Sequence, residues 1–361
     1  MNKKIKLSLL ASSLLLVSTS AFAESNSIKD AFANGKTSGD ITVYTVTQDN
    51  SGAADAGFTV GSIGLGFETD TVNGFSAAIG FRAQHEFDEE NNGDYAGEIA
   101  NDAIAHTAVI KYANENFFLS VGRQEIDLEW LGDYNESVVA GITAVPDTTI
   151  VLGYTDRQAE IGFDHVDDFS EITKDGAYVL DVKYNGIENV ELNPYFYSAP
   201  DVADFYGLKA SYDNDMFGFT AHYAASSEDT GPDGDVYNLE ARAKFAGISA
   251  ALGYIGTDKT VGAGSIPAYG DNMNPLDEAG YAYGADEETV YGSLSYEISG
   301  IALTAIYGTT ETAGGDADEL NLIAEYNFSE QLSGAITYVD YDDKGLTGDF
   351  DKVYANLTYS F

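Results

Sequence analysis

Residues Gly74–Glu86, which read GFSAAIGFRAQHE, alternate between apolar and polar side chains. Phe75, Ala77, Ile79, Phe81 and Ala83 share one phase of the alternation, and Ser76, Arg82, Gln84 and Glu86 share the other. Because a strand sends successive side chains to opposite faces, this segment has one apolar and one polar face. The pattern recurs to the last residue, behind an export signal and without any cysteine. This combination predicts a transmembrane β-barrel with lipid outside and water inside.

The first 23 residues have the features of a cleaved signal peptide. Lys3, Lys4 and Lys6 precede an apolar stretch, Leu7–Val17, and the small residues around Ala23 form a cleavage site before Glu24. The apolar stretch is shorter than the ~20 residues that a membrane-spanning helix needs. We therefore expect export and an integral location in the cell outer membrane.

The charge of the chain is strongly acidic, with 17 Lys and Arg against 59 Asp and Glu. Three of the bases lie in the signal, so the mature chain keeps 14 bases against 59 acids, a net charge of −45. Nothing would offset phosphate repulsion, so we expect no nucleic-acid partner. Any concave surface should attract cations.

After a short lead-in over residues 24–38, a single barrel domain is expected over 39–361. We place its strands near 39–48, 58–69, 74–86, 103–113, 117–126, 137–145, 149–158, 176–185, 189–198, 202–212, 216–225, 235–245, 248–257, 289–298, 301–310, 317–328, 332–341 and 350–361. Eight connections are tight turns, and between them lie longer acidic segments such as 88–102, 159–175, 258–288 and 311–316. Short turns on one rim and long loops on the other are typical of outer-membrane barrels. The pattern gives 18 antiparallel strands, or 16 if residues 137–158 hold fewer strands than assigned.

Aromatic residues repeat beside the tight turns, as Phe75, Phe117 and Phe245 illustrate, and predict one aromatic girdle at a membrane boundary. The final strand alternates as well and ends in Tyr359 and Phe361. An alternating last strand that ends in Phe is similar to the signal that passes outer-membrane proteins to the barrel-assembly machinery.

Three short stretches, DAFANGKTSG at 30–39, VNGFSA at 72–77 and SVGRQEI at 120–126, resemble the Campylobacter-type major outer-membrane porins and related substrate-specific channels. The resemblance implies an 18-stranded barrel, a homotrimer, and passive diffusion of ions and small hydrophilic solutes through an outer membrane of lipid and lipopolysaccharide. One feature departs from the substrate-specific branch, whose channels line one wall with many bases. This chain has few bases, which argues against specificity for carboxylate substrates.

In porins an inward-folded loop narrows the lumen, and opposed acids and bases set the selectivity there. The third loop by our count spans 125–136 and carries Glu125, Asp127, Glu129, Asp133 and Glu136 with Trp130. The bases expected on the lumen face are Arg82, Lys111, Arg123, Lys183, Lys209, Arg242 and Lys244. An acidic loop opposite a sparse basic wall would favour cations.

Strand 235–245 gives the clearest assignment of the two faces. Glu240, Arg242 and Lys244 share one phase, and a charge facing lipid costs about 2–4 kcal/mol near the membrane midplane. The charged phase should therefore face the lumen.

No cofactor is required by any motif. Residues 88–99 begin like a calcium loop, but the closing acid would fall on Ile99, so Asp88, Glu90, Asp94 and Glu98 predict at most loose calcium binding. Catalytic motifs such as Gly-x-Ser-x-Gly do not occur, and we expect no enzyme. The alternative to a porin is a surface structural protein or adhesin whose acidic loops, rather than its lumen, carry the function.

Overall fold

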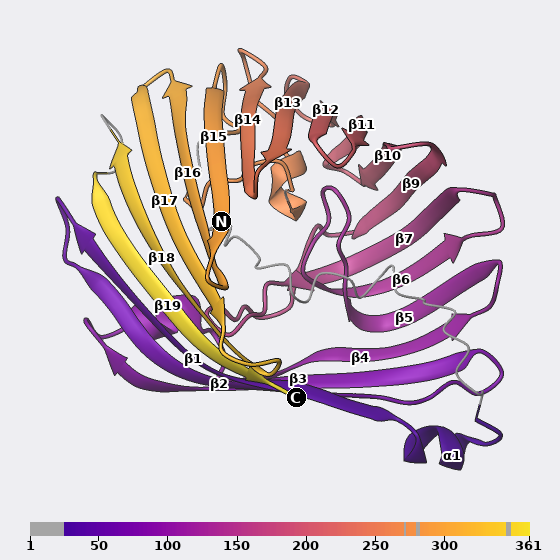
Figure 1. Cartoon of the computed structure of the whole chain (residues 1–361). Helices are drawn as coiled ribbons and strands as arrows, with labels where there is room; N and C mark the ends of the chain where they lie inside the picture. The colour runs from indigo at the N-terminus through magenta and orange to yellow at the C-terminus, as the bar shows by residue number, and fades with distance from the viewer. Residues whose placement is uncertain (1–24, 271, 279–281, 344–347) are drawn as a thin grey trace.

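The first and last strands pair with each other and close the sheet into a barrel (Figure 1). In this computed structural model, which describes residues 25–270, 272–278, 282–343 and 348–361, β1 (Lys36–Asn50) runs antiparallel to β19 (Phe350–Ser360). Ile41 lies opposite Tyr359, and Gly39 and Phe361 exchange backbone hydrogen bonds of 3.0 Å. Closure leaves no strand edge unpaired, as a lipid environment requires.

The described chain has 18 long strands, each antiparallel to its neighbours, which confirms the predicted fold. Between β1 and β19 the long strands are β2 (Ala56–Glu68), β3 (Phe75–Glu89), β4 (Ala103–Ala113), β5 (Phe117–Glu125), β6 (Tyr134–Ile142), β7 (Thr148–Ala159), β9 (Ala177–Ile187), β10 (Val190–Ala199), β11 (Ala203–Asp213), β12 (Phe217–Glu228), β13 (Gly234–Phe245), β14 (Ile248–Thr257), β15 (Glu288–Ile298), β16 (Ile301–Thr312), β17 (Gly315–Asn327) and β18 (Leu332–Asp343). A two-residue strand, β8 (Ser170–Glu171), pairs only with the end of β7. Residues 137–158 hold two strands, so the 16-strand alternative is wrong.

The two rims differ less regularly than the sequence predicted. Tight turns lie on one rim, whereas on the other rim β10 and β11 are joined by residues 200–202 and β16 and β17 by residues 313–314. The expected long segment 311–316 is therefore wrong, because Glu311 pairs with Asp316 within the ladder. The long connections on this rim are 90–102, 126–133, 160–176 and 258–287.

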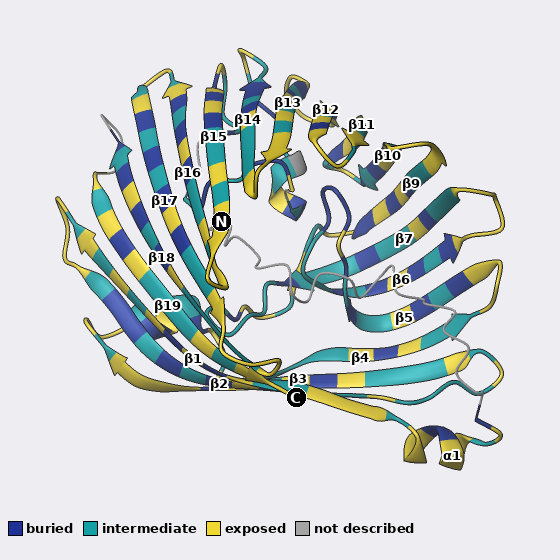
Figure 2. Cartoon of the chain, in the orientation of Figure 1, coloured by how far each residue is buried: buried dark blue, intermediate teal, exposed yellow. Residues whose placement is uncertain are grey.

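Side chains alternate along each strand between an outward face suited to lipid and an inward face suited to water, as the sequence predicted. Outward residues such as Leu252 and Leu294 are 64% and 59% exposed, and the inward phase is buried or polar (Figure 2). A second set of outward aromatics, not predicted, stands toward the long-loop ends of the strands. Tyr223 and Tyr237 are register partners there, and the Tyr223 hydroxyl lies 3.4 Å from Asp235. Because tyrosine has an apolar ring and a polar tip, these residues form a second girdle.

The lead-in folds as a short helix, α1 (Ile28–Ala33), which Ser27 caps through its side chain. It lies beside the start of β1, where Phe32 stacks on Phe67 with ring centroids 6.0 Å apart (Figure 1). The predicted signal peptide, with its cleavage between Ala23 and Glu24, falls outside the described residues. The other helical segments are α2 (Asp94–Glu98) and a 3-10 turn, η1 (Ile266–Tyr269). Within the described ranges, no helix is both long and apolar enough to cross a membrane.

Candidate pore constriction

The loop 126–133, between β5 and β6, folds into the barrel and packs against the wall formed by β10, β11 and β12. Its Trp130 is completely buried and donates a hydrogen bond from Nε1 to the hydroxyl of Tyr195 on β10, at 2.8 Å. The same hydroxyl lies 2.8 Å from Nε2 of His222 on β12. Because the hydroxyl oxygen accepts the hydrogen bond from the indole N–H, the hydroxyl proton of Tyr195 is free to be donated to Nε2 of His222. The aromatic anchor therefore fixes this loop to β10 and β12.

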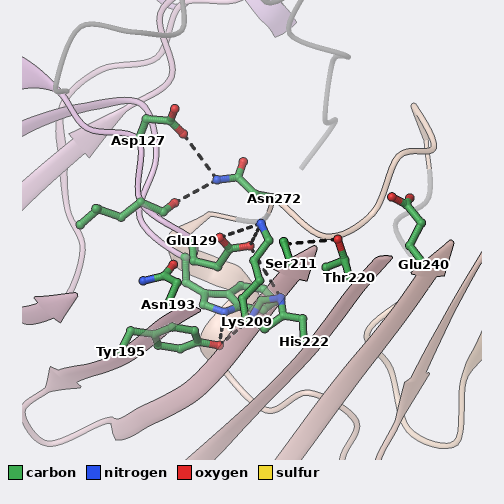
Figure 3. Close-up of polar contacts among 12 residues, drawn as sticks. Asp127, Glu129, Asn193, Tyr195, Lys209, Ser211, Thr220, His222, Glu240 and Asn272 are labelled. Atoms are coloured by element: carbon green, nitrogen blue, oxygen red, sulfur yellow. Dashed lines mark hydrogen bonds and ion pairs between the residues drawn. The ribbon is translucent and has the colours of Figure 1, made fainter. Parts of the chain in front are cut away.

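An ion pair joins the same loop to β11. Glu129 accepts hydrogen bonds of 2.8 and 3.0 Å from Nζ of Lys209, and Nδ1 of His222 lies 3.6 Å from the same carboxylate (Figure 3). The Glu129 side chain is almost fully buried. A buried carboxylate needs such a partner, because its desolvation costs several kcal/mol. This loop is the predicted constriction loop, and Glu129 and Lys209 are brought together as an acid of the loop and a base of the wall.

A second inward segment comes from the connection 258–287. Nδ2 of Asn272 donates to the carbonyl of Leu128 at 3.0 Å and lies 3.5 Å from Asp127, and the Tyr269 ring packs on Phe205 of β11 at 5.3 Å. The sequence did not indicate this packing, because the segment has no periodic pattern. Its apolar residues were the one feature of the sequence that could have indicated burial. Met273, for example, lies in the buried cluster around Trp130.

Two further loops meet over β1 and β2. His165, in the loop 160–176, lies 2.9 Å from Glu98 and 3.2 Å from Asp167, and Phe163 packs on Tyr44 of β1 at 5.7 Å. The hydrogen bond to Glu98 raises the pKa of His165 to about 9, against the opposing effect of burial. The imidazole therefore carries a positive charge at neutral pH and joins the two loops.

Four of the predicted lumen bases, including the Lys209 described above, face inward and lie in local ion pairs. Arg82 pairs with Asp40 at 2.8 Å, Lys111 with Glu68 at 3.0 Å, and Arg242 with both Asp213 and Glu240. Among the described residues Lys183 and Lys244 form no ion pair. A continuous basic wall opposite an acidic loop is therefore not what the structure contains, since acids of the wall itself neutralise three of these bases and Glu129 of the loop neutralises Lys209.

Arg123 and Glu136 do not face the lumen, which corrects the sequence prediction. They are register partners on β5 and β6, in phase with the exposed Val121 and Val138 and out of phase with the buried Ser120 and Ser137. They pair at 2.7 Å, and the guanidinium stacks 4.2 Å from the ring of Phe169. The ion pair joins β5 to β6 where these strands lead into the loop 126–133, so its charges stabilise the wall and do not line the lumen.

The remaining candidate acids are dispersed. Glu125 and Asp133 lie at the two ends of the loop 126–133, and Asp133 adopts a positive φ of 59° in the turn. For calcium, Asp94 accepts hydrogen bonds from the backbone of Gly57 and Asn91, while Glu98 bonds His165. Within the described ranges no three acidic or histidine side chains converge as metal ligands. Asp88, Glu90, Asp94 and Glu98 do not form one site, and loose calcium binding stays a prediction.

Comparisons with known proteins agree with this architecture. The family model described as Gram-negative porin matches residues 10–361. None of the curated proteins compared with the chain matches it. Among solved structures, OccAB1 of Acinetobacter baumannii is 13% identical with a TM-score of 0.76, over 92% of this chain and 97% of that one. OpdO of Pseudomonas aeruginosa is 14% identical with a TM-score of 0.76, over 92% and 98% of the two chains. OpdK of Pseudomonas aeruginosa is 15% identical with a TM-score of 0.73, over 91% and 99%.

At these identities the solved structures establish the fold alone, whereas the family model covers nearly the whole chain. The chain therefore belongs to the Gram-negative porin family, and it is an integral outer-membrane channel for small solutes rather than an enzyme.

Proposed function

We propose that this channel prefers cations and carries ions and small hydrophilic solutes down their gradients. The observation that carries the proposal is that four of the six bases on the lumen face are neutralised, while Lys183 and Lys244 form no ion pair among the described residues. Arg82, Lys111, Lys209 and Arg242 each have a carboxylate partner, and Arg242 has two. A paired base contributes little to the field at a distance, so the acids, which outnumber the bases 59 to 17 in the full sequence, dominate the potential that a passing ion experiences.

Acids on the lumen face that have no basic partner also favour cations. Glu191 and Glu325 lie on the inward phase of β10 and β17, and among the described residues neither has a basic partner. The overall excess of 59 acids over 17 bases adds a long-range attraction for cations to both mouths.

The test is single-channel recording in a planar bilayer with asymmetric potassium chloride. The expected reversal potential has the sign of potassium permeation, and its magnitude should fall at high ionic strength because salt screens the field. A reversal potential that favours chloride would overturn the proposal.

Several narrower expectations belong to the same proposal. These are a homotrimeric assembly, contact with lipopolysaccharide, membership of the Campylobacter-type group, and recognition of Tyr359 and Phe361 by the barrel-assembly machinery. The structural or adhesin alternative is less well supported, because the loops 126–133 and 160–176 fold onto the barrel interior instead of projecting a surface for a partner.

A further inference from the structure

The segment 272–278 reaches a second wall of the barrel, away from the one that holds Trp130. Leu276 forms a buried cluster with Ile306 of β16 and Ile323 of β17, both on the inward phase of their strands. Its Cδ1 atom lies only 2.6 Å from where a Cβ of residue 308 would stand, so Gly308 leaves the space that this side chain fills. The apolar contact fixes where the segment meets the wall.

Charged groups complete the contact. The Glu319 carboxylate of β17 accepts hydrogen bonds from the backbone N–H groups of Asp277 and Glu278, at 2.7 and 3.1 Å. Nζ of Lys352, on β19, bonds the Glu278 carboxylate and lies 3.4 Å from Asp277. The Tyr354 hydroxyl donates to Asp277 at 3.1 Å. Strands β17 and β19 therefore bind the backbone and the side chains of the same two residues, Asp277 and Glu278.

The charged groups that join the segment 272–278 to the wall are almost completely buried. The side chains of Lys352 and Asp277 are 7% and 1% exposed. Asn321, also fully buried, donates to Glu319 at 2.9 Å. The carboxylates of Asp277 and Glu278 share the ammonium of Lys352, so Lys352 is the group on which their charges depend. Removing one partner from a buried ion pair is strongly destabilising, because it leaves the other charge desolvated.

The other end of the segment is tied to the opposite side. Asn272 bonds the loop 126–133, which is itself fixed to β10, β11 and β12, while Asp277 and Glu278 reach β17 and β19. From these contacts we propose that Lys352 and Glu319 are positioning residues that hold the segment 272–278 across the lumen and thereby set the width of the conducting path. The inference rests on the channel function and is independent of the cation preference.

Single-channel recording of the full chain tests it. Lys352→Met should release the segment and raise the frequency of current transitions at least about tenfold, since a buried charge pair is lost. Lys352→Arg should restore quiet openings, because it keeps the charge. Lys259→Met is the matched control. Lys259 lies in the same connection and pairs with Asp286, but both side chains are exposed, so its loss should leave the current unchanged.

A second variant keeps the test independent of barrel assembly. Asp277→Ala with Glu278→Ala alters only the segment and should reproduce the noise of Lys352→Met. Heat-modifiable migration in gels, which reports a closed barrel, accompanies each variant. If folded Lys352→Met and the double variant both show wild-type transitions, the positioning role is wrong. A change of reversal potential without added transitions would also contradict it, while leaving the cation preference standing.

Discussion

Glu129 and Lys209 are separated by 80 residues in sequence, yet the Lys209 ammonium donates to both oxygens of the Glu129 carboxylate, at 2.8 and 3.0 Å. This pair joins a loop that leaves the barrel at β5 to β11, which lies five long strands further around the barrel. Together with the Trp130–Tyr195 hydrogen bond, it turns a flexible connection into a fixed part of the lumen.

The hydrogen bond between Trp130 and Tyr195 can be tested directly by fluorescence, because Trp130 is the only tryptophan of the chain. Tyr195→Phe removes the acceptor of the indole N–H and should cost about 1–3 kcal/mol for the unsatisfied buried donor. We expect a red shift of the tryptophan emission and a lower denaturant midpoint for that signal. Tyr206→Phe, on the outward phase of β11, serves as the control and should leave the emission unchanged. An unshifted spectrum in Tyr195→Phe would show that the hydrogen bond does not hold the loop.

Charge selectivity should depend on the acids around Arg242. The double variant Asp213→Asn with Glu240→Gln leaves the guanidinium without its two carboxylates and exposes a positive charge to the lumen. The potassium-to-chloride permeability ratio should fall several-fold, measured as a smaller reversal potential. Asp204→Asn removes an exposed acid on the outward phase of β11 and should change the ratio little. Equal ratios in both variants would place the selectivity elsewhere.

The contact between the loops 90–102 and 160–176 should weaken at high pH. The pKa of His165 is raised to about 9, chiefly by its hydrogen bond to Glu98, so the folded state holds the proton more tightly than the unfolded state. The resulting stability is complete below about 6.5 and is lost as the pH rises through about 9. Hydrogen exchange of the backbone amides in both loops should accelerate across this interval in the wild type. His165→Gln should abolish the pH dependence, and an unchanged profile in that variant would disprove the assignment.

Because neighbouring residues of a strand face lipid and water in turn, the same substitution should cost the barrel different amounts of stability at adjacent positions. Leu294 is outward and exposed to lipid, so Leu294→Arg should destabilise the folded barrel by about 2–4 kcal/mol near the midplane. Ser293, on the inward phase, should accept arginine at a much smaller cost. The midpoint of urea unfolding in lipid vesicles measures both. Equal destabilisation by the two substitutions would mean that the phase of β15 is misassigned.

Much of this architecture follows from local sequence. The alternation of Phe75, Ala77 and Ile79 with Ser76 fixes which face of β3 meets lipid, because only neighbouring positions are involved. The tight turns are local as well, as Ala246 and Gly247 show with positive φ angles of 51° and 82°. The lumen assignment of Glu240 and Arg242 followed from the same alternation and agrees with the structure.

Other features could not be read from the chain. Glu136 lies within the loop as the sequence delimits it, yet the structure places it on β6, where its phase directs it outward to Arg123. The segment 311–316 looks like an acidic loop, yet its residues extend β16 and β17. In both cases the position at which a strand ends decides the orientation, and that position depends on partners in other strands.

The sequence by itself determined which face of each strand meets lipid, narrowed the number of strands to 18 or 16, and fixed the excess of acid, because these depend on spacing and composition along the chain. Only the tertiary structure decided which charges meet. Barrel closure brings Asp277 to Lys352 and Glu129 to Lys209 over 75 and 80 residues, and such contacts between charges are a property of distance in space.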